Sequence, residues 1–179
     1  MFESLEILQF PDERLRRLSH PVETFNKELK ALADKMLEIM YQSNGIGLAA
    51  PQVNQTIRLI VVDVSEDRNT PCIFINPKIK QPSGSVDSSE GCLSVPGFYE
   101  KVDRFNYIKY EATDIDGNKF VSEATELLAV CIQHEIDHLD GKLFVDYLSD
   151  MKRSKIQKGL IKQNNNNSDI QRKENPYIK

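Results

Sequence analysis

The chain has 179 residues, 40% of them hydrophobic and 28% charged, an ordinary composition for a single globular domain. No apolar run approaches the ~20 residues of a membrane helix, and the start MFESLEILQF lacks the basic and apolar segments of a secretory signal. Three cysteines are too few for a disulfide framework. We therefore expect a cytoplasmic protein, not associated with a membrane, whose thiols are free or bind a metal.

The net charge of −4 hides a difference between the tail and the body. Residues 151–179 hold eight Lys and Arg against two Asp and Glu, a net +6, so residues 1–150 carry −10. A basic tail on an acidic body could contact nucleic acid. A solvated helix face is the equally good alternative.

In chain order, the first clear element is a helix over residues 27–42. Leucine, alanine and methionine side chains recur there at intervals of three and four residues, which places them on one apolar stripe. Asn26 can cap the start of this helix, and Asn44-Gly45 can end it.

Strands are predicted in the middle of the chain. Residues 57–64 are rich in β-branched side chains and indicate a buried strand, and residues 72–75 indicate a second one. Residues 105–113 alternate between apolar and polar side chains, as in a strand with one buried face. The dipeptide Asp116-Gly117 then favours a hairpin turn into a strand over residues 119–121.

The pattern becomes helical again over residues 124–139, with Gly141 as a stop, and this helix is apolar nearly all round, so it should be buried. A last helix is predicted near residues 148–161. These elements favour one α+β domain over residues 1–162, with mixed or antiparallel sheets packed around the central buried helix and a C-terminal helix. Residues 163–179, which open with an Asn-rich run, should form a disordered polar tail.

The segment Gln133-His134-Glu135-Ile136-Asp137-His138 carries the clearest chemical signal. Histidines four residues apart lie on one helix face, so both imidazoles can reach one ion, and Glu135 can approach a water molecule at that ion. Buried imidazoles without a partner would be unfavourable, and a divalent ion removes that penalty. The alternative is a pair of satisfied core histidines, or a purely structural metal. Asp137 should point away from the ion and either form a salt bridge or orient a neighbouring side chain.

Two imidazoles leave a catalytic ion in need of a third protein ligand. Cys72 lies in an apolar strand, where a small core residue is the better interpretation, and Cys131 lies one turn before His134, on the pocket wall. Cys92 lies in a segment whose Gly and Pro residues impose an extended turn, and an accessible thiol beside a cation ionises readily. Cys92 is therefore the best third ligand among the candidates, which are His20, Cys72, Cys92, Cys131 and the acidic residues.

The segment GIGLAAPQ at residues 45–52 has small residues where a backbone could pass close to another group. Taken alone it is a weak signal, because it lacks the third glycine of a dinucleotide fingerprint and does not follow a strand. A tight helix-to-strand turn is the alternative. Gln52 adds a neutral amide donor that could stabilise a developing oxyanion.

Three segments together resemble the peptide deformylases: GIGLAAPQ at 45–52, EGCLS at 90–94 and QHEIDHLDG at 133–141, in matching order and spacing. The opening FPDERLRRLSHPV and the strand-rich middle are similar to the bacterial form. The resemblance implies a metal-dependent hydrolase that removes the N-formyl group from the initiator methionine of nascent polypeptides and releases formate. It also implies one divalent ion, typically Fe²⁺, in a site that Zn²⁺, Ni²⁺ or Co²⁺ can also occupy.

The resemblance also assigns roles to individual positions. Glu135 would be the general base and acid, and Gln52 with the backbone N–H of Leu93 would form an oxyanion hole. Ile46 and Gly47 would lie along the substrate cleft, and Glu90 would support the site, where a contact with Arg104 is possible. On helix geometry, Leu127, Val130 and Cys131 could line an apolar pocket for the methionine side chain. The metal ligands would be Cys92, His134 and His138.

Two other classes of function compete with this interpretation. A small metalloendopeptidase could use the same two histidines, but the missing secretory signal and the thiol ligand argue against it. A non-catalytic binding module would hold a structural metal. The protein is expected to be a monomer, and its basic C-terminal region could meet ribosomal RNA near the exit tunnel through Lys152, Arg153, Lys155, Lys158 and Lys162.

Overall fold

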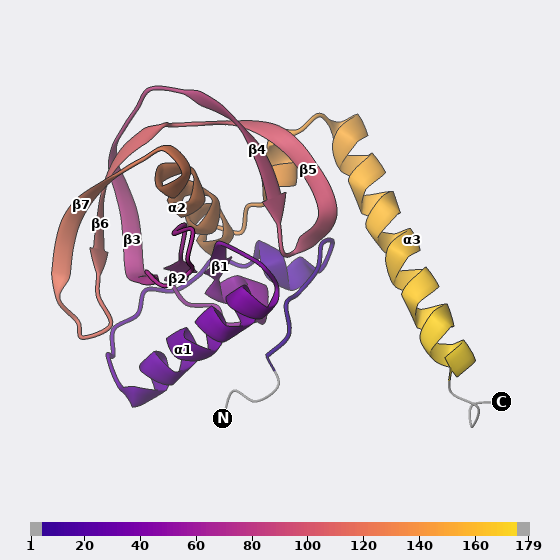
Figure 1. Ribbon diagram of the computed structural model, residues 1–179, viewed down its shortest axis with the longest axis horizontal. Helices are drawn as coiled ribbons and strands as arrows, with labels where there is room; N and C mark the ends of the chain where they lie inside the picture. Colours follow the sequence, from indigo (N-terminus) through magenta and orange to yellow (C-terminus); the bar gives the residue numbers. More distant parts are fainter. Residues whose placement is uncertain (1–4, 175–179) are drawn as a thin grey trace.

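The computed structural model describes the backbone of residues 5–174 and the side chains of residues 5–163. Figure 1 shows strands that curve around the central helix α2, with α1 below them and α3 extending away from the body. The helices are α1 (Lys27–Gln42), α2 (Glu126–Leu139) and α3 (Asp150–Glu174), with short 3-10 turns η1 (Glu13–Arg16), η2 (Ala50–Val53) and η3 (Phe144–Tyr147). The strands are β1 (Gly47–Ala49), β2 (Leu59–Val62), β3 (Cys72–Ser83), β4 (Val86–Cys92), β5 (Val95–Arg104), β6 (Tyr107–Thr113) and β7 (Lys119–Thr125).

The strands form two antiparallel sheets. Five of them pair in the order β1-β2-β3-β6-β7, and β4 and β5 form a separate two-stranded ribbon. This arrangement confirms the α+β class with antiparallel sheets around a buried helix and a C-terminal helix. None of the helices in the described part of the chain combines the length and apolar character needed to cross a membrane.

Helix α1 has the predicted bounds, and its start is set by Asn26, whose side-chain oxygen accepts a hydrogen bond of 2.9 Å from the Leu29 N–H. Its apolar stripe is buried against Leu59 and Val61 of β2. Side chains of a strand point alternately to its two faces, so Ile60 lies on the opposite face of β2, where it packs with α2. The central sheet is therefore covered by one helix on each face.

Helix α2 is buried along most of its length, as predicted, because its side chains pack against strands of the five-stranded sheet. Leu127 is the exposed one among its apolar residues: it is 53% exposed, on the side that faces the cavity described below. Strand β7 runs directly into α2, so the hairpin β6–β7 fixes where the helix begins.

Strand β3 extends to Ser83, well past the predicted end at residue 75. The sequence did not predict this extension, because proline, here Pro77, is unusual inside a sheet. The strand tolerates it through a bulge at Asn76, which has a positive φ of 52°. The Asn76 side chain secures this bulge by exchanging hydrogen bonds of 2.8 and 2.9 Å with the Val22 backbone.

Helix α3 is longer than the sequence indicated. The prediction placed it near residues 148–161, whereas its backbone is helical through the Asn-rich run to Glu174. Ile156 and Leu160 anchor its first half, because both are buried against the ribbon and the N-terminal segment. Residues 175–179 lie outside the described residues, and disorder of the tail in solution stays a prediction.

Candidate metal centre and cleft

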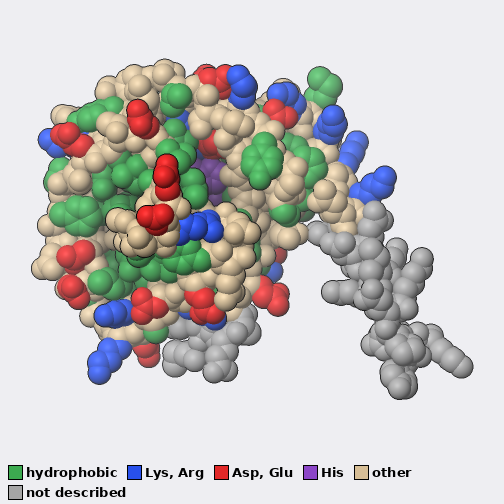
Figure 2. All heavy atoms as spheres, viewed as in Figure 1, with side chains coloured by type: hydrophobic (Ala, Val, Ile, Leu, Met, Phe, Trp, Pro, Cys, Tyr) green, Lys and Arg blue, Asp and Glu red, His purple; other side chains and the backbone are tan. Residues whose placement is uncertain are grey.

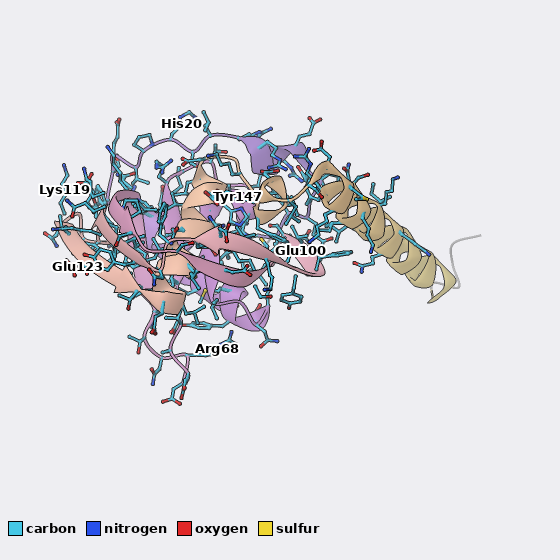
Figure 3. The ribbon with its side chains drawn as sticks, turned by 90° about the horizontal axis from the view of Figure 1, so that it is seen from above. His20, Arg68, Glu100, Lys119, Glu123 and Tyr147 are labelled. Carbon is cyan, nitrogen blue, oxygen red and sulfur yellow. The ribbon has the colours of Figure 1, made fainter. Side chains whose placement is uncertain are left out.

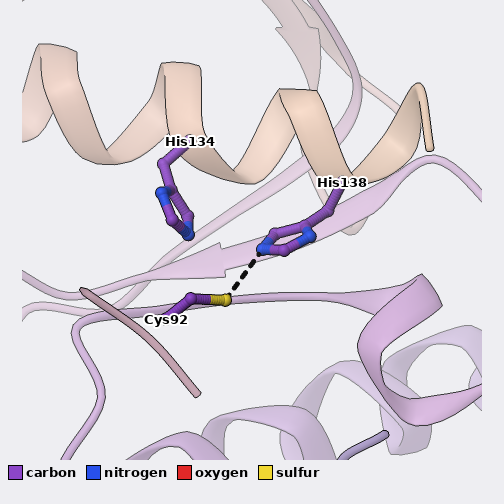
Figure 4. A group of neighbouring side chains, drawn as sticks. All are labelled: Cys92, His134 and His138. Carbon is purple, nitrogen blue, oxygen red and sulfur yellow. Dashed lines mark hydrogen bonds between the residues drawn. The ribbon is translucent and has the colours of Figure 1, made fainter. Parts of the chain in front are cut away.

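The side chains of Cys92, His134 and His138 meet at one point. One donor atom from each lies within 4.8 Å of the other two, and the Cys92 Sγ is 3.3 Å from the His138 Nε2 (Figure 4). The two histidines occupy successive turns of α2, as their spacing predicted, and Cys92 ends strand β4. The other candidates, His20 and Cys72, lie outside this group.

A tight connection aims the thiol of Cys92 at α2. The ribbon β4–β5 has a register shift between Glu90 and Cys92, after which Cys92 pairs with Val95. The Ser94 N–H lies 3.4 Å from the Cys92 Sγ and the Gln52 Nε2 lies 3.5 Å from it, both as donors. These two contacts hold the sulfur in place facing α2, and a thiolate is the form of cysteine that binds metals.

His134 is oriented by a buried carboxylate. Its Nδ1 is 2.8 Å from the Glu90 Oε2, which leaves its Nε2 free to act as a donor atom of the candidate metal site. Arg104 holds Glu90 through contacts of 2.6 and 3.0 Å, and its Nη1 also reaches the Asp137 Oδ2 at 2.6 Å. The Tyr147 hydroxyl donates to the same Asp137 oxygen at 2.8 Å. The expected salt bridge of Asp137 and the suggested Glu90–Arg104 contact are thus both present.

The charge around the three donors suits a cation. Burial alone would lower the pKa of His134, but hydrogen bonds to Cys92 and Glu90 hold that pKa well above its usual value. The site therefore attracts positive charge, which a divalent ion supplies when both imidazoles are neutral. One sulfur and two nitrogens suit either Zn²⁺ or Fe²⁺. The residues present fit such an ion.

Glu135 lies next to this group with its carboxyl group enclosed. It is 4% exposed, its Oε2 has no hydrogen-bond partner within the described part of the chain, and burial raises its pKa to about 7. Gly47 makes room for the carboxyl group: a Cβ on Gly47 would lie 2.3 Å from the Glu135 Oε1 and 2.8 Å from the Cys131 Sγ. A side chain at this position would have to displace the Glu135 carboxyl group or the Cys131 thiol.

Gln52 is held rigidly at the same site. It is 1% exposed, its Oε1 accepts a 2.8 Å hydrogen bond from the Ala49 N–H, and its Nε2 donates to the Ser94 Oγ at 3.1 Å. This pattern fixes which end of the amide is the donor. Sequence reasoning missed Ser94, although it lies inside the EGCLS segment, because Gln52, the partner of its hydroxyl group, is distant in the sequence.

A cavity of about 850 Å³ opens beside these residues. Figure 2 shows purple histidine atoms visible from outside between hydrophobic side chains. Sequence reasoning did not expect the N-terminal segment Leu5–Gln9 or the ribbon residues Phe98 and Tyr99 among its walls, and His138 lies behind the lining. The predicted site residues that do line it are Ile46, Gly47, Gln52, Glu90, Cys92, Leu93, Leu127, Val130, Cys131, His134 and Glu135.

Comparison with known proteins identifies the family. The family model described as polypeptide deformylase matches residues 4–154. The peptide deformylases of Hahella chejuensis and Pseudomonas aeruginosa are 54% and 55% identical over 160 residues, which cover 89% of this chain and 95% of each relative.

Solved structures show the same likeness. The crystal structure of a peptide deformylase from Legionella pneumophila superposes with a TM-score of 0.88 at 43% identity, covering 92% of this chain and 97% of that one. The peptide deformylase from Ehrlichia chaffeensis in complex with actinonin has a TM-score of 0.86 at 39% identity, covering 89% and 96%. The chain belongs to the polypeptide deformylase family.

Proposed function

We propose that the cavity beside Cys92, His134 and His138 is the place where this deformylase removes the N-formyl group from the initiator methionine of nascent polypeptides, releasing formate. One observation carries the proposal. Three donor atoms lie within 4.8 Å of one another, and two of them, from Cys92 and His134, share a cavity wall with the enclosed carboxyl group of Glu135. This is the arrangement that metal-assisted hydrolysis of an amide requires.

Cys92, His134 and His138 would hold one divalent ion, with Glu90 fixing the ring of His134. When bound, such an ion acts as a Lewis acid and makes a hydroxide nucleophile available at neutral pH. The donor set does not choose between Fe²⁺ and Zn²⁺, and the family resemblance supports Fe²⁺, with Zn²⁺, Ni²⁺ or Co²⁺ as substitutes. Metal analysis of protein prepared without air, together with formate release, tests this choice.

The chain's own groups would handle the proton and the developing charge. Glu135 would accept a proton from the attacking water and deliver it to the leaving amine, because its Oε2 is not engaged by another group of the described chain. The Gln52 Nε2, pinned by Ser94, and the Leu93 N–H would donate to the oxygen of the formyl group as it gains charge. Removing one such donor typically costs about 10²–10³ in turnover.

The first residue of the substrate would lie between the two sides of the cavity. The segment with Ile46 and Gly47 forms one side, and Gly47 leaves room for the Glu135 carboxyl group. Leu127, Val130 and Cys131 form an apolar wall on α2, which suits a methionine side chain.

Replacing Glu135 by Gln tests the proposal directly. Deformylation of a formyl-methionyl peptide should fall by about 10²–10⁴, the usual contribution of a general acid–base group. Metal content and circular dichroism should match the wild type, since Gln has the same shape. Wild-type protein should leave an internal peptide bond intact, which separates this function from that of an endopeptidase. Unchanged deformylation in the Glu135→Gln variant would contradict the role of Glu135.

We further propose that the protein works as a cytoplasmic monomer, and that the basic side of α3 approaches the ribosome. Two of its cations are already paired, Lys152 with Glu100 and Arg153 with Asp150, both at 2.7 Å. Lys155, Lys158 and Lys162 are exposed and available. Replacing these three by Ala should weaken ribosome association and reduce its salt dependence, measured as co-sedimentation across a salt series. Equal, salt-insensitive association of both proteins would exclude this contact.

A further inference from the structure

The segment Asn44–Ile46 forms one wall of the cavity, and the loop of residues 63–71 after β2 packs behind this wall. The carbonyl groups of Gly45 and Ile46 both accept hydrogen bonds from this loop. The Asp63 N–H donates to the Ile46 oxygen at 2.9 Å, and the Arg68 Nη2 donates to the Gly45 oxygen at 2.7 Å. The wall is therefore tied to a part of the chain that does not itself line the cavity.

Arg68 reaches the wall from an unusual backbone conformation. Its φ of 53° lies in the left-handed region, which residues with a Cβ rarely adopt. Its guanidinium group lies over the Tyr41 ring, 5.8 Å from the centroid, and its Nη1 is 3.4 Å from the Asn44 Oδ1. A strained backbone persists where the surroundings over-determine it, and such residues concentrate at ligand clamps.

The loop that carries Arg68 is organised by a buried carboxylate. Asp63 is 1% exposed and accepts hydrogen bonds from the Ser65 N–H at 2.9 Å, the Ser65 hydroxyl at 2.6 Å and the Thr70 N–H at 3.2 Å. The Tyr41 hydroxyl donates to it at 2.6 Å, which ties the loop to α1. Figure 3 shows Arg68 at the loop that projects from the body, so this anchoring network keeps an otherwise exposed segment in place.

Gly45 lies between Arg68, which contacts its carbonyl oxygen, and Leu93, which lines the cavity. A Cβ on Gly45 would lie only 2.7 Å from the Leu93 Cδ1, so there is little free space between the wall and the residue whose N–H is proposed to bind the developing oxyanion. A shift of Gly45 would consequently disturb the cavity wall and its packing against the Leu93 side chain.

We propose that Arg68 is a positioning residue for deformylation, which fixes the wall segment Asn44–Ile46 through the Gly45 carbonyl without touching the substrate. The inference rests on the proposed function, since it concerns the same cavity. It predicts that loss of the guanidinium fork weakens productive binding of the substrate more than it slows the chemical step, because Glu135 and the metal ligands lie on α2 and β4.

The test compares Arg68→Ala, Arg68→Lys and the wild type, all as full-length metal-loaded protein. With a formyl-methionyl peptide, Arg68→Ala should raise KM about tenfold and change kcat less than about threefold, because small misplacements of a binding group lower productive binding strongly. Arg68→Lys keeps one donor for the Gly45 carbonyl and should recover part of the loss. Hydrogen exchange should become faster over residues 44–49 and stay unchanged over residues 126–139.

Arg14→Ala is the matched control. Like Arg68, Arg14 is an arginine that does not line the cavity, but its guanidinium group contacts the Asp12 carboxylate at 2.6 Å and not the segment Asn44–Ile46. Its KM, kcat and exchange over residues 44–49 should equal those of the wild type. Wild-type KM and exchange in Arg68→Ala, equal losses in Arg14→Ala, or faster exchange throughout the chain would each overturn the proposal. Because exchange is measured without substrate, the anchoring is tested even if the deformylation mechanism proves different.

Discussion

Gly47 illustrates how a residue without a side chain determines the position of a functional group. Its φ is not in the left-handed region, so backbone freedom does not explain it. The reason is space: the Glu135 carboxyl group and the Cys131 thiol occupy the volume that a Cβ would need. The glycine that sequence reasoning placed along the substrate cleft is thus also required by the proposed proton carrier.

We expect Gly47→Ala to reduce deformylation at least about 10²-fold, because the added Cβ must displace the Glu135 carboxyl group or push β1 outward. The backbone can accommodate alanine, so the protein should still fold, with circular dichroism and bound metal close to those of the wild type. Formate release from a formyl-methionyl peptide measures the effect. Activity close to that of the wild type would show that Glu135 does not need its present position.

At the scale of elements, the ribbon β4–β5 carries two cross-strand ion pairs of opposite character. Lys101 and Asp87 form an exposed pair at 2.7 Å, with side chains 75% and 51% exposed. Arg104 and Glu90 form a pair at 2.6 Å whose side chains are 5% and 4% exposed, and Arg104 also holds Asp137 of α2. The second pair therefore joins the ribbon to the helix that carries both histidines.

Removing the buried cation should be far more damaging than removing the exposed one. Arg104→Leu leaves the carboxylates of Glu90 and Asp137 uncompensated in a buried setting, and we expect a loss of about 3–5 kcal/mol in unfolding free energy. Lys101→Ala, on the same strand, should have a much smaller effect, because exposed ion pairs contribute little to stability. Urea unfolding of both variants measures the difference, and comparable losses would mean that the buried network contributes no more than a surface pair.

Individual elements show which parts of the structure could be predicted from the sequence. Helix α1 and the pair His134 and His138 were predicted because their signals are local: a cap, a stripe and a spacing of four. The ribbon β4–β5 was missed as a pair of strands, since its polar sequence has no apolar run and its pairing is not visible locally. The full length of α3 was missed because asparagine has low helix propensity.

At the scale of the whole molecule, the candidate metal centre lies between hydrophobic clusters that are built mainly from residues outside it. One cluster joins α2 to the central sheet, a second joins α1 to its other face, and a third joins the ribbon to η3 and α3. The chain is also large enough to bury its own core. Metal binding should therefore add stability to a fold that exists without it, unlike the case of a small zinc domain.

Removal of the metal should consequently leave a folded protein with a lower Tm. Ligand linkage gives about 2.7 kcal/mol when free metal exceeds Kd a hundredfold, so chelation should lower the Tm by several degrees while unfolding stays cooperative. Cys92→Ala should lose this metal-dependent shift, whereas Cys72→Ala, which removes a half-buried thiol outside the metal group, should keep it. Loss of cooperative unfolding on chelation would show that the hydrophobic clusters do not suffice. A full shift in Cys92→Ala would remove this thiol from the ligand set.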